Sequence, residues 1–422
     1  MKVTLAYGRK GLVVNVPENS EIVLPQFTPG ISDETGTLRE ALGNPIQSPP
    51  LAQLVSTGDT AVIVHTDITR ATPNAVILPV VIAELESAGV RREDITLLNG
   101  LGTHRRQSES ELRSMLGDSL VDNYYCLQHD CYDDPNLVPI GHTALGHPVR
   151  INRHYLEADL RILTGFIEPH FFAGYSGGPK AILPSLAGAE SVFTNHGLSM
   201  IGDIRATWGV TLGNPIWEEM RDVALKTDPT FLLNVTLNSG REITGIFAGD
   251  MLEAHARGCA FVKKTAMVEV EAPYDIVLTT NSGYPLDQNL YQSVKGISAA
   301  SKIVKENGTI IIAAACEDGL PDHGQYADLL RKAGSPAGVI EMISQSGFSV
   351  QDQWQVQIQA QIQQRADVFV YSDNLSDEQI SNALFKPCRD IEATIRELQE
   401  RYGRDSRICV LPEGPQTIPF LA

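Results

Sequence analysis

The chain has 422 residues, of which 43% are hydrophobic and 20% charged, a composition typical of a folded globular enzyme rather than a disordered or fibrous protein. Its formal net charge of −18 disfavours nucleic acid and anionic membranes as partners, because binding to either requires clustered Lys and Arg. No apolar run approaches the roughly 18 residues of a membrane span, and no secretory apolar segment or C-x-x-C pattern is present, so we expect a cytoplasmic protein with reduced thiols.

Strand and helix patterns alternate from the first third of the chain onward. Buried-strand patterns at 61–66 and 94–100 each run into a polar loop and then into a helical pattern, at 75–89 and from Ser108 onward. Ser108 is followed three residues later by Glu111, the spacing of a capping box. Repeated strand, loop and helix indicate a parallel sheet.

The same alternation continues to the C-terminus. Further strands are expected at 159–167, 274–283, 308–316, 366–372 and 407–414, and further helices at 187–197, 289–306 and 389–402. We predict an α/β fold of two α/β domains with mainly parallel sheets, residues 1–268 and 269–422. Such sheets bind ligands at the carboxyl ends of their strands, so we expect an active-site cleft between the domains.

Polar loops follow the first two strands. Asp67 and Arg70 leave the first strand together, and an arginine there can hold a carboxylate or phosphate. The alternative is a surface ion pair beside a helix that begins at Pro73. His104 leaves the second strand in the sequence G-L-G-T-H-R and is suited to proton transfer, the alternative being a structural histidine.

The segment 168–180, E-P-H-F-F-A-G-Y-S-G-G-P-K, follows the next strand. Its glycines have no side chain to bury, so core packing does not explain the composition and we predict a binding loop. The end of the segment lacks the G-x-x-x-x-G-K-[ST] spacing of nucleotide triphosphatases, because Ala181 follows Lys180. The aromatic side chains of Phe171, Phe172 and Tyr175 favour an apolar side to the pocket.

Four later residues have two interpretations each. Gly197 is typical of a helix end, so His196 before it is either a cationic cap or a metal ligand. Gln292 and Lys295 share a face of an expected helix and can hold a carboxylate or simply face solvent. Trp354 either lines a pocket or shields the edge of the core.

Taken in order, these loops resemble those of the nickel-pincer lactate racemase family. The resemblance rests on D-x-T-R-x-x-P at 67–73, G-T-H-R at 102–105, E-P-H-F-F-A-G-x-S-G-G at 168–178, Lys180, N-H-G at 195–197, Y-Q-x-x-K at 291–295 and Trp354. The chain departs from the family at Pro179, where a basic residue is expected before the lysine.

The resemblance implies a nickel-pincer nucleotide, pyridinium-3-thioamide-5-thiocarboxylic acid mononucleotide, attached covalently to Lys180, with His196 as the nickel ligand. It implies catalysis by His104, His170 and Lys180. Cofactor contacts are implied for Asp67, Gly174, Ser176, Gly177 and Gly178, and substrate contacts for Arg70, Tyr291, Gln292, Lys295 and Trp354.

The implied reaction is racemisation or epimerisation of a small 2-hydroxy acid, such as lactate. The hydride on carbon 2 moves to the cofactor ring and back, through a 2-keto acid, while the two histidines handle the hydroxyl proton. The implied partners are this substrate and the proteins that make the cofactor.

Two other functions are weighed against this one. An NAD-dependent 2-hydroxy acid dehydrogenase requires a G-x-G-x-x-G after a strand, with an acidic residue about 20 positions later, and no such motif is found. An inert binding or cofactor-storage protein on the same scaffold is disfavoured because every expected catalytic position is filled.

Overall fold

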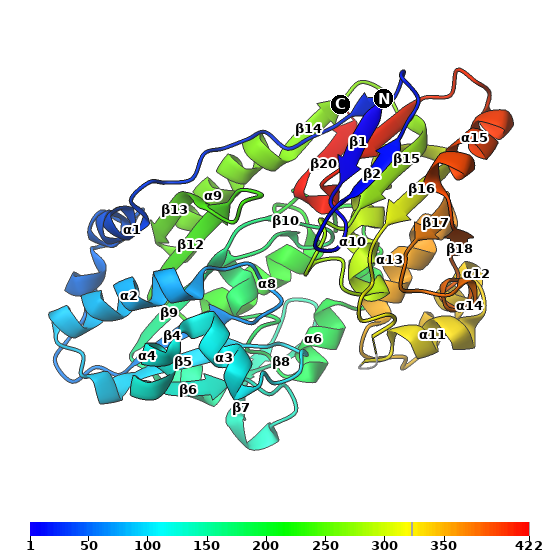
Figure 1. The fold of residues 1–422 in the computed structure, drawn as a ribbon. Helices are drawn as coiled ribbons and strands as arrows, with labels where there is room; N and C mark the ends of the chain where they lie inside the picture. Colours follow the sequence, from blue (N-terminus) through cyan, green and yellow to red (C-terminus); the bar gives the residue numbers. More distant parts are fainter. Residues whose placement is uncertain (322–323, 422) are drawn as a thin grey trace. The chain divides into compact units, whose positions relative to one another are not determined.

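The computed structural model describes residues 1–321 and 324–421, which fall into two compact units (Figure 1). The first unit comprises Phe27–His196 and Asp203–Lys263. The second unit comprises Met1–Gln26, the short segment Gly197–Gly202 and the chain from Lys264 onward. The second unit therefore combines the N-terminal residues with the C-terminal part of the chain.

The first unit is built on a sheet of six strands within the described residues, in the order β13-β12-β9-β4-β5-β6. Neighbouring strands are parallel, except that β13 is antiparallel to β12. The strands are β4 (Ala61–Thr66), β5 (Ile95–Gly100), β6 (Tyr125–Gln128), β9 (Leu160–Phe166), β12 (Phe231–Leu237) and β13 (Ile243–Gly249). Two hairpins stand apart from this sheet: β7 (Leu137–His142) with β8 (Pro148–Asn152), and β10 (Pro169–His170) with β11 (Gly174–Tyr175).

Helices connect these strands. They are α1 (Glu34–Gly43), α2 (Asn74–Ala88), α3 (Glu109–Leu116), α4 (Asp118–Asn123), α5 (Arg153–Glu157), α6 (Ala189–Asn195), α8 (Pro215–Lys226) and α9 (Met251–Ala266), with short 3-10 turns η1 (Leu51–Leu54), η2 (Arg92–Asp94), η3 (Asp134–Asn136) and η4 (Gly178–Ala181). Local sequence explains several ends: Ser108 and Glu111 form the expected capping box, and Gly89 ends α2 in the left-handed conformation. The apolar run of β4 is buried, as expected for a parallel strand covered on both faces.

The second unit is built on a parallel sheet in the order β18-β17-β16-β15-β19-β3 within the described chain. Its strands are β3 (Glu21–Ile22), β15 (Tyr274–Thr280), β16 (Val304–Ala313), β17 (Asp367–Tyr371), β18 (Lys386–Cys388) and β19 (Ile408–Leu411). A hairpin of β1 (Lys2–Leu5) and β2 (Leu12–Asn15) and a parallel pair of β14 (Met267–Val270) and β20 (Ile418–Leu421) accompany it. The helices are α7 (Leu198–Ile201), α10 (Leu290–Ala300), α11 (Tyr326–Ala333), α12 (Pro336–Ile343), α13 (Gln353–Gln363), α14 (Asp377–Asn382) and α15 (Ile391–Tyr402), with the 3-10 turn η5 (Gly414–Gln416).

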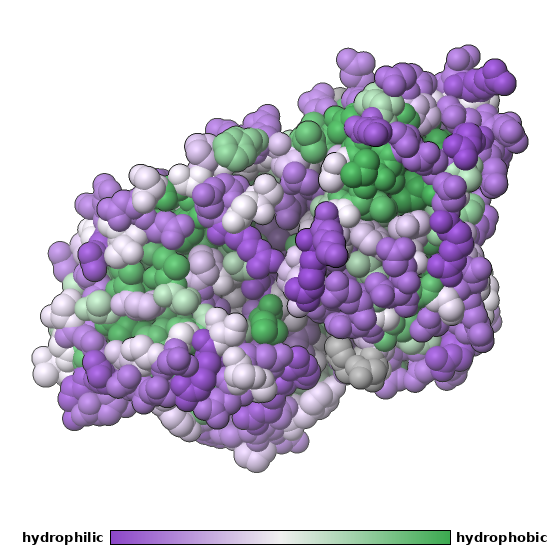
Figure 2. All heavy atoms as spheres, in the orientation of Figure 1, coloured by the Kyte–Doolittle hydropathy of each residue, from purple (hydrophilic) through white to green (hydrophobic). Residues whose placement is uncertain are grey.

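Strand β2 shows the alternation that a two-faced strand requires. Val14 is buried in the core of the second unit, whereas its neighbour Val13 is 61% exposed. Figure 2 shows the resulting apolar area over the β1–β2 hairpin.

The predicted α/β class with mainly parallel sheets is confirmed, but two helix boundaries are wrong. The helix expected at 289–306 ends at Ala300, because the β-branched Val304 begins strand β16 and pairs with Tyr274. The helix expected at 187–197 is α6, which begins at Ala189 and ends at Asn195, two residues inside the expected range at each end. Gly197 directly follows the C-cap residue of α6, as expected of a residue at a helix end, and with φ −73° it is also the N-cap of the next helix, α7.

Candidate active site

The candidate residues of the first unit lie in loops at one edge of its sheet. Asp67 follows β4, His104 follows β5, and the segment 168–180 follows β9. Because these three strands are parallel neighbours, their carboxyl ends share one edge. The loops that the sequence singled out are thereby brought together.

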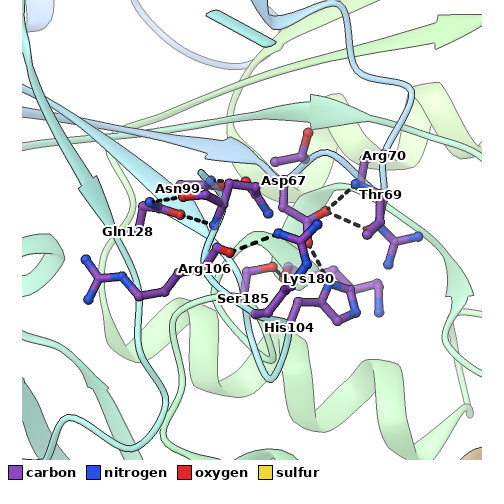
Figure 3. A network of polar contacts seen from close by, with 12 residues as sticks. Asp67, Thr69, Arg70, Asn99, His104, Arg106, Gln128, Lys180 and Ser185 are labelled. Atoms are coloured by element: carbon purple, nitrogen blue, oxygen red, sulfur yellow. Dashed lines mark hydrogen bonds and ion pairs between the residues drawn. The ribbon is translucent and has the colours of Figure 1, made fainter. Parts of the chain in front are cut away.

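Asp67 and His104 are in direct contact at this edge. Oδ2 of Asp67 lies 2.5 Å from Nδ1 of His104, and both the N–H and the hydroxyl of Thr69 donate to Oδ1, at 3.1 and 2.6 Å (Figure 3). The carboxyl group is 3% exposed, whereas the imidazole is 42% exposed. Burial raises the pKa of Asp67, but the charge and hydrogen bond of His104, with help from Arg70 and Thr69, outweigh burial and lower the pKa to about 2.

The loop that carries His104 is held by backbone contacts. The side chain of Gln128 exchanges two hydrogen bonds with the backbone of Gln107, at 2.7 and 2.9 Å. The N–H of Gly102 donates to the carbonyl of Ser185 (3.0 Å), and the Ser185 hydroxyl donates to the carbonyl of Lys180 (2.7 Å). Ser185 therefore links the loop of His104 to Lys180. Figure 3 shows these three residues close together.

Arg70 forms an ion pair with Glu168. The sequence suggested an ion pair with Asp67 as one alternative, but the guanidinium of Arg70 lies 3.7 Å from Oε1 of Glu168. This separation is longer than a hydrogen bond, so the ion pair is loose. Arg70 stays half-buried at the same edge as Asp67.

Phe172 is the centre of the aromatic part of the site. Its ring centroid lies 4.5 Å from that of His170 and 4.9 Å from that of His196, both edge-on, and 5.7 Å from the ammonium nitrogen of Lys180. Phe171 packs against both His170 and Phe172. One buried ring thus contacts three of the residues predicted to carry chemistry.

His170 and His196 are held in defined states. The N–H of Ala173 donates to Nδ1 of His170 (3.2 Å), which favours the neutral ring with its proton on Nε2. Burial, and then the charge of Lys180, lower the pKa of His196 well below its usual value. His196 is the C-cap residue of α6, and its lowered pKa favours the neutral ring, the form that binds metals, over a cationic cap.

The glycines of segment 168–180 are explained by close approaches within the first unit. A Cβ on Gly174, whose φ is +75°, would lie 2.1 Å from the carbonyl oxygen of Val210. Gly177 and Gly178 also have positive φ, and their missing side chains leave room for Asn234 and His255. The hydroxyl of Ser176 donates to the carbonyl of Phe166 and accepts from the N–H of Glu168, both at 2.9 Å.

A buried polar chain that sequence reasoning missed supports the end of α6. Nδ2 of Asn195 donates to Oε1 of Glu219 (3.0 Å), and Oε2 of Glu219 lies 2.8 Å from Nδ1 of His147. The side chain of Glu219 is 4% exposed. Glu219 lies among apolar residues of α8, and this break in the apolar pattern was the available indication.

The second unit carries the remaining candidates. Tyr291, Gln292 and Lys295 lie on α10, and Trp354 lies near the start of α13. The indole N–H of Trp354 donates to the hydroxyl of Tyr291 (3.3 Å), and the side chain of Gln355 donates to the carbonyl of Tyr291 (2.5 Å). The structure thus brings Tyr291 and Trp354 together, although they are 63 residues apart.

The described residues contain neither a metal-binding cluster nor a membrane-spanning helix. Among them, no group of three or more His, Cys, Asp or Glu side chains is arranged to hold a metal ion. None of the helices in the described ranges has the length and apolar character needed to cross a membrane.

Comparison with known proteins decides the family. Residues 7–209 match the model of the lactate racemase N-terminal domain, and residues 269–418 match the model of the lactate racemase C-terminal domain. The chain belongs to the lactate racemase family. The resemblance found in the loops is therefore confirmed over most of the sequence.

Individual members of the lactate racemase family are similar over nearly the whole chain. The lactate racemase of Thermoanaerobacterium thermosaccharolyticum is 34% identical over 99% of this chain and 98% of that protein. The lactate racemase of Lactiplantibacillus plantarum is 35% identical over 90% of each chain. The structure of the Thermoanaerobacterium apoprotein matches with a TM-score of 0.91 over 99% of this chain and 100% of that chain, at 34% identity.

A Thermotoga maritima crystal structure matches at 18% identity with a TM-score of 0.70, over 94% of this chain and 100% of that chain, and shows the fold alone.

All the predicted site residues lie within the two lactate racemase domain matches. Asn234 and His255, which sequence reasoning missed, lie between the matched ranges. The indications for them were a polar residue inside the apolar strand F-L-L-N-V-T-L and a histidine on the buried face of α9.

Proposed function

We propose that this protein is a racemase or epimerase of small 2-hydroxy acids such as lactate. The named relatives are lactate racemases, and the family match extends over both halves of the chain. The observation that carries the proposal is the Asp67–His104 pair, linked through Ser185 to Lys180. A histidine held by a buried carboxylate is suited to removing a hydroxyl proton beside a reacting carbon.

His104 is assigned the removal of the proton. Because ionised Asp67 only accepts hydrogen bonds, Nδ1 of His104 donates to it, which leaves Nε2 as the nitrogen that can take up a proton. In the proposal, Nε2 takes the proton of the substrate 2-hydroxyl. Asp67, with a pKa of about 2, stays ionised and stabilises the imidazolium that forms.

His170 is assigned the proton step on the other face of the substrate. With Nδ1 accepting from Ala173, the neutral ring can donate from Nε2 to a substrate oxygen. To return a proton, the ring must first be protonated at Nδ1 by solvent, which breaks the hydrogen bond from Ala173. It then gives the Nε2 proton to the oxygen of the re-formed alkoxide, while His104 releases its proton to solvent. Two histidines with different partners can therefore serve the two directions of one reaction.

The proposal includes the nickel-pincer nucleotide, pyridinium-3-thioamide-5-thiocarboxylic acid mononucleotide, on Lys180, with His196 as the nickel ligand. The residues fit this group, because Lys180 and His196 flank the same Phe172 ring and the lowered pKa of His196 favours the neutral form that binds metals. When bound, the group would accept the hydride of carbon 2, leaving a 2-keto acid, and return it to either face. Cofactor contacts by Asp67, Gly174, Ser176, Gly177 and Gly178 stay a prediction, because contacts within the protein already explain these residues.

The substrate carboxylate is assigned to cationic and amide side chains. Arg70 suits this role because its 3.7 Å contact with Glu168 is loose enough for a substrate carboxylate to compete. Gln292, Lys295, Tyr291 and Trp354 of the second unit are proposed as further substrate contacts. We also propose a cytoplasmic location, with the cofactor-making proteins as partners.

Intact-mass measurement and a racemisation assay test the proposal together. Protein coexpressed with the cofactor-making enzymes is expected to carry an adduct that Lys180→Ala abolishes, and to interconvert the enantiomers of lactate or a related acid. Substrate deuterated at carbon 2 is expected to react more slowly. Racemisation by protein with an unmodified Lys180 would overturn the tethered-cofactor mechanism.

The same preparation separates the alternatives. A dehydrogenase would require added NAD for turnover. A storage protein would carry the adduct and nickel yet turn over no member of a broad panel of 2-hydroxy acids.

A further inference from the structure

A tight turn immediately precedes Lys180. Gly177 and Gly178 have φ of +74° and +52°, and the chain then enters the 3-10 turn η4, which contains Lys180. The backbone N–H of Lys180 donates to the carbonyl of Gly177 (3.2 Å). The direction in which Lys180 leaves the backbone therefore depends on this turn.

Asn234 supports the turn from strand β12. Its Oδ1 accepts from the N–H of Gly178 at 2.8 Å, and a Cβ on Gly177 would lie 2.5 Å from the same oxygen. Asn234 is fully buried. An amide inside an apolar strand costs stability unless it is hydrogen-bonded, and here it satisfies a backbone group of the loop.

His255 supports the turn from helix α9. Its Nε2 lies 2.9 Å from the carbonyl oxygen of Ser176, and a Cβ on Gly178 would lie 2.5 Å from Cγ of the ring. Burial lowers the pKa of His255 to about 4, so the ring is neutral at physiological pH. A carbonyl oxygen only accepts hydrogen bonds, which places the proton of the neutral ring on Nε2.

The surroundings of His255 keep its ring in place. Trp217 stacks on it, with an interplanar angle of 15° and centroids 6.4 Å apart. On the same helix, a Cβ on Gly258 would lie 2.2 Å from Cδ1 of Ile167, so glycine there lets α9 approach the end of β9 closely. Neighbouring strands β9 and β12 and helix α9 thus converge on one turn.

We propose that His255 and Asn234 are positioning residues that hold the Gly177–Gly178 turn so that Lys180 is presented for attachment of the cofactor. Neither residue is assigned contact with substrate or with the reacting atoms. The inference rests on the proposed function only in taking Lys180 as the attachment point.

The first test uses the protein without cofactor. Lys180 is 8% exposed, so the supported turn should protect its amine from amidination by methyl acetimidate. The extent of this labelling at Lys180 is followed by the mass of the peptide that contains it. In His255→Leu, Lys180 is expected to react at least about fivefold faster, while the exposed Lys226 reacts at its usual rate. His255→Gln, which keeps an N–H donor of similar reach, is expected to restore protection to within about twofold.

A second buried histidine provides the matched control. Nε2 of His129 also contacts a backbone carbonyl, that of Ala187, at 3.1 Å. His129→Leu removes an equivalent hydrogen bond away from the turn and should leave the labelling of Lys180 unchanged. If His255→Leu fails to fold, Asn234→Ser takes its place. The shorter serine side chain withdraws the acceptor from the N–H of Gly178, and the labelling of Lys180 is measured in the same way.

The second test is the fraction of Lys180 that carries the adduct after coexpression with the cofactor-making enzymes. It is expected to fall at least about fivefold in His255→Leu and to recover in His255→Gln. Wild-type labelling of Lys180, or a wild-type level of adduct, in folded His255→Leu would overturn the positioning role. Wild-type protein without any adduct would overturn the proposed function instead, and the labelling would still decide the role of His255.

Discussion

The imidazole of His104 is oriented by Asp67, whose Oδ2 lies 2.5 Å from its Nδ1. The carboxylate is almost completely buried, whereas the imidazole is partly exposed. One partner is thus fixed inside the protein, and the other is partly accessible from outside. In this arrangement, the buried carboxylate determines which ring nitrogen of the base carries the proton.

Asp67→Asn is expected to lower kcat by about 100-fold or more, because the amide no longer stabilises an imidazolium at His104. The KM of the substrate should change little. The matched control is Thr69→Val, which removes one hydrogen bond to Oδ1 but leaves the carboxylate, and should cost about tenfold or less. A steady-state assay of racemisation by loaded enzyme measures both, and near-normal turnover in Asp67→Asn would refute the pairing as a catalytic device.

Gly174→Ala is expected to destabilise the protein by about 3 kcal/mol or more, because a Cβ there would lie 2.1 Å from the carbonyl oxygen of Val210. Gly141→Ala is the control. Gly141 also has a positive φ, +100°, but nothing lies within 4 Å of its Cβ position, so only backbone strain of about 1–2 kcal/mol applies. Denaturant unfolding compares the two, and equal losses would show that the close approach is unimportant.

The low pKa of buried His129 predicts that the protein loses stability in acid. Burial lowers its pKa to about 4, and the neutral ring donates to the carbonyl of Ala187 and accepts from Asn152. Because the folded pKa is below the unfolded value near 6.5, stability is complete above about pH 6.5 and falls as the pH drops toward 4, by about 3 kcal/mol in total.

His129→Gln removes this titration. The free energy of unfolding of that variant should therefore fall by about 3 kcal/mol less than that of the wild type between pH 7 and pH 4. Denaturant titrations at a series of pH values supply the comparison. Identical pH dependence in the two proteins would mean that His129 does not titrate in this range.

Glu219→Ala is expected to destabilise the protein by about 2–4 kcal/mol, because it leaves Asn195 and His147 without their shared carboxylate. Glu219→Gln keeps an oxygen that can accept from Asn195 and should cost less, about 1–2 kcal/mol. Chemical unfolding of the two variants gives the difference. A smaller loss in the alanine variant than in the glutamine variant would contradict the role of Glu219 as the acceptor for Asn195.

Much of the candidate site is predictable from the order of residues along the chain. Asp67, His104 and segment 168–180 stand out because polar and glycine-rich residues directly follow apolar strand patterns, and the ends of parallel strands share one edge. Helix lengths are less predictable: the helix at 289–306 ends early because Val304 pairs with a strand that lies 30 residues before it in the chain. The pairing of Val304 with Tyr274 cannot be predicted from local periodicity.

The sequence by itself determined the class of the fold, the order of the loops and the family, because these depend on local apolar patterns and on the identity of residues at strand ends. Only the tertiary structure decided that Asp67 pairs with His104 while Arg70 faces Glu168, that His196 is neutral, and that Asn234 and His255 support the turn before Lys180. These contacts join residues between 37 and 98 positions apart, and the burial that sets the state of His196 depends on the packing around its ring. Charge states and long-range partners follow from three-dimensional packing, which local sequence patterns do not specify.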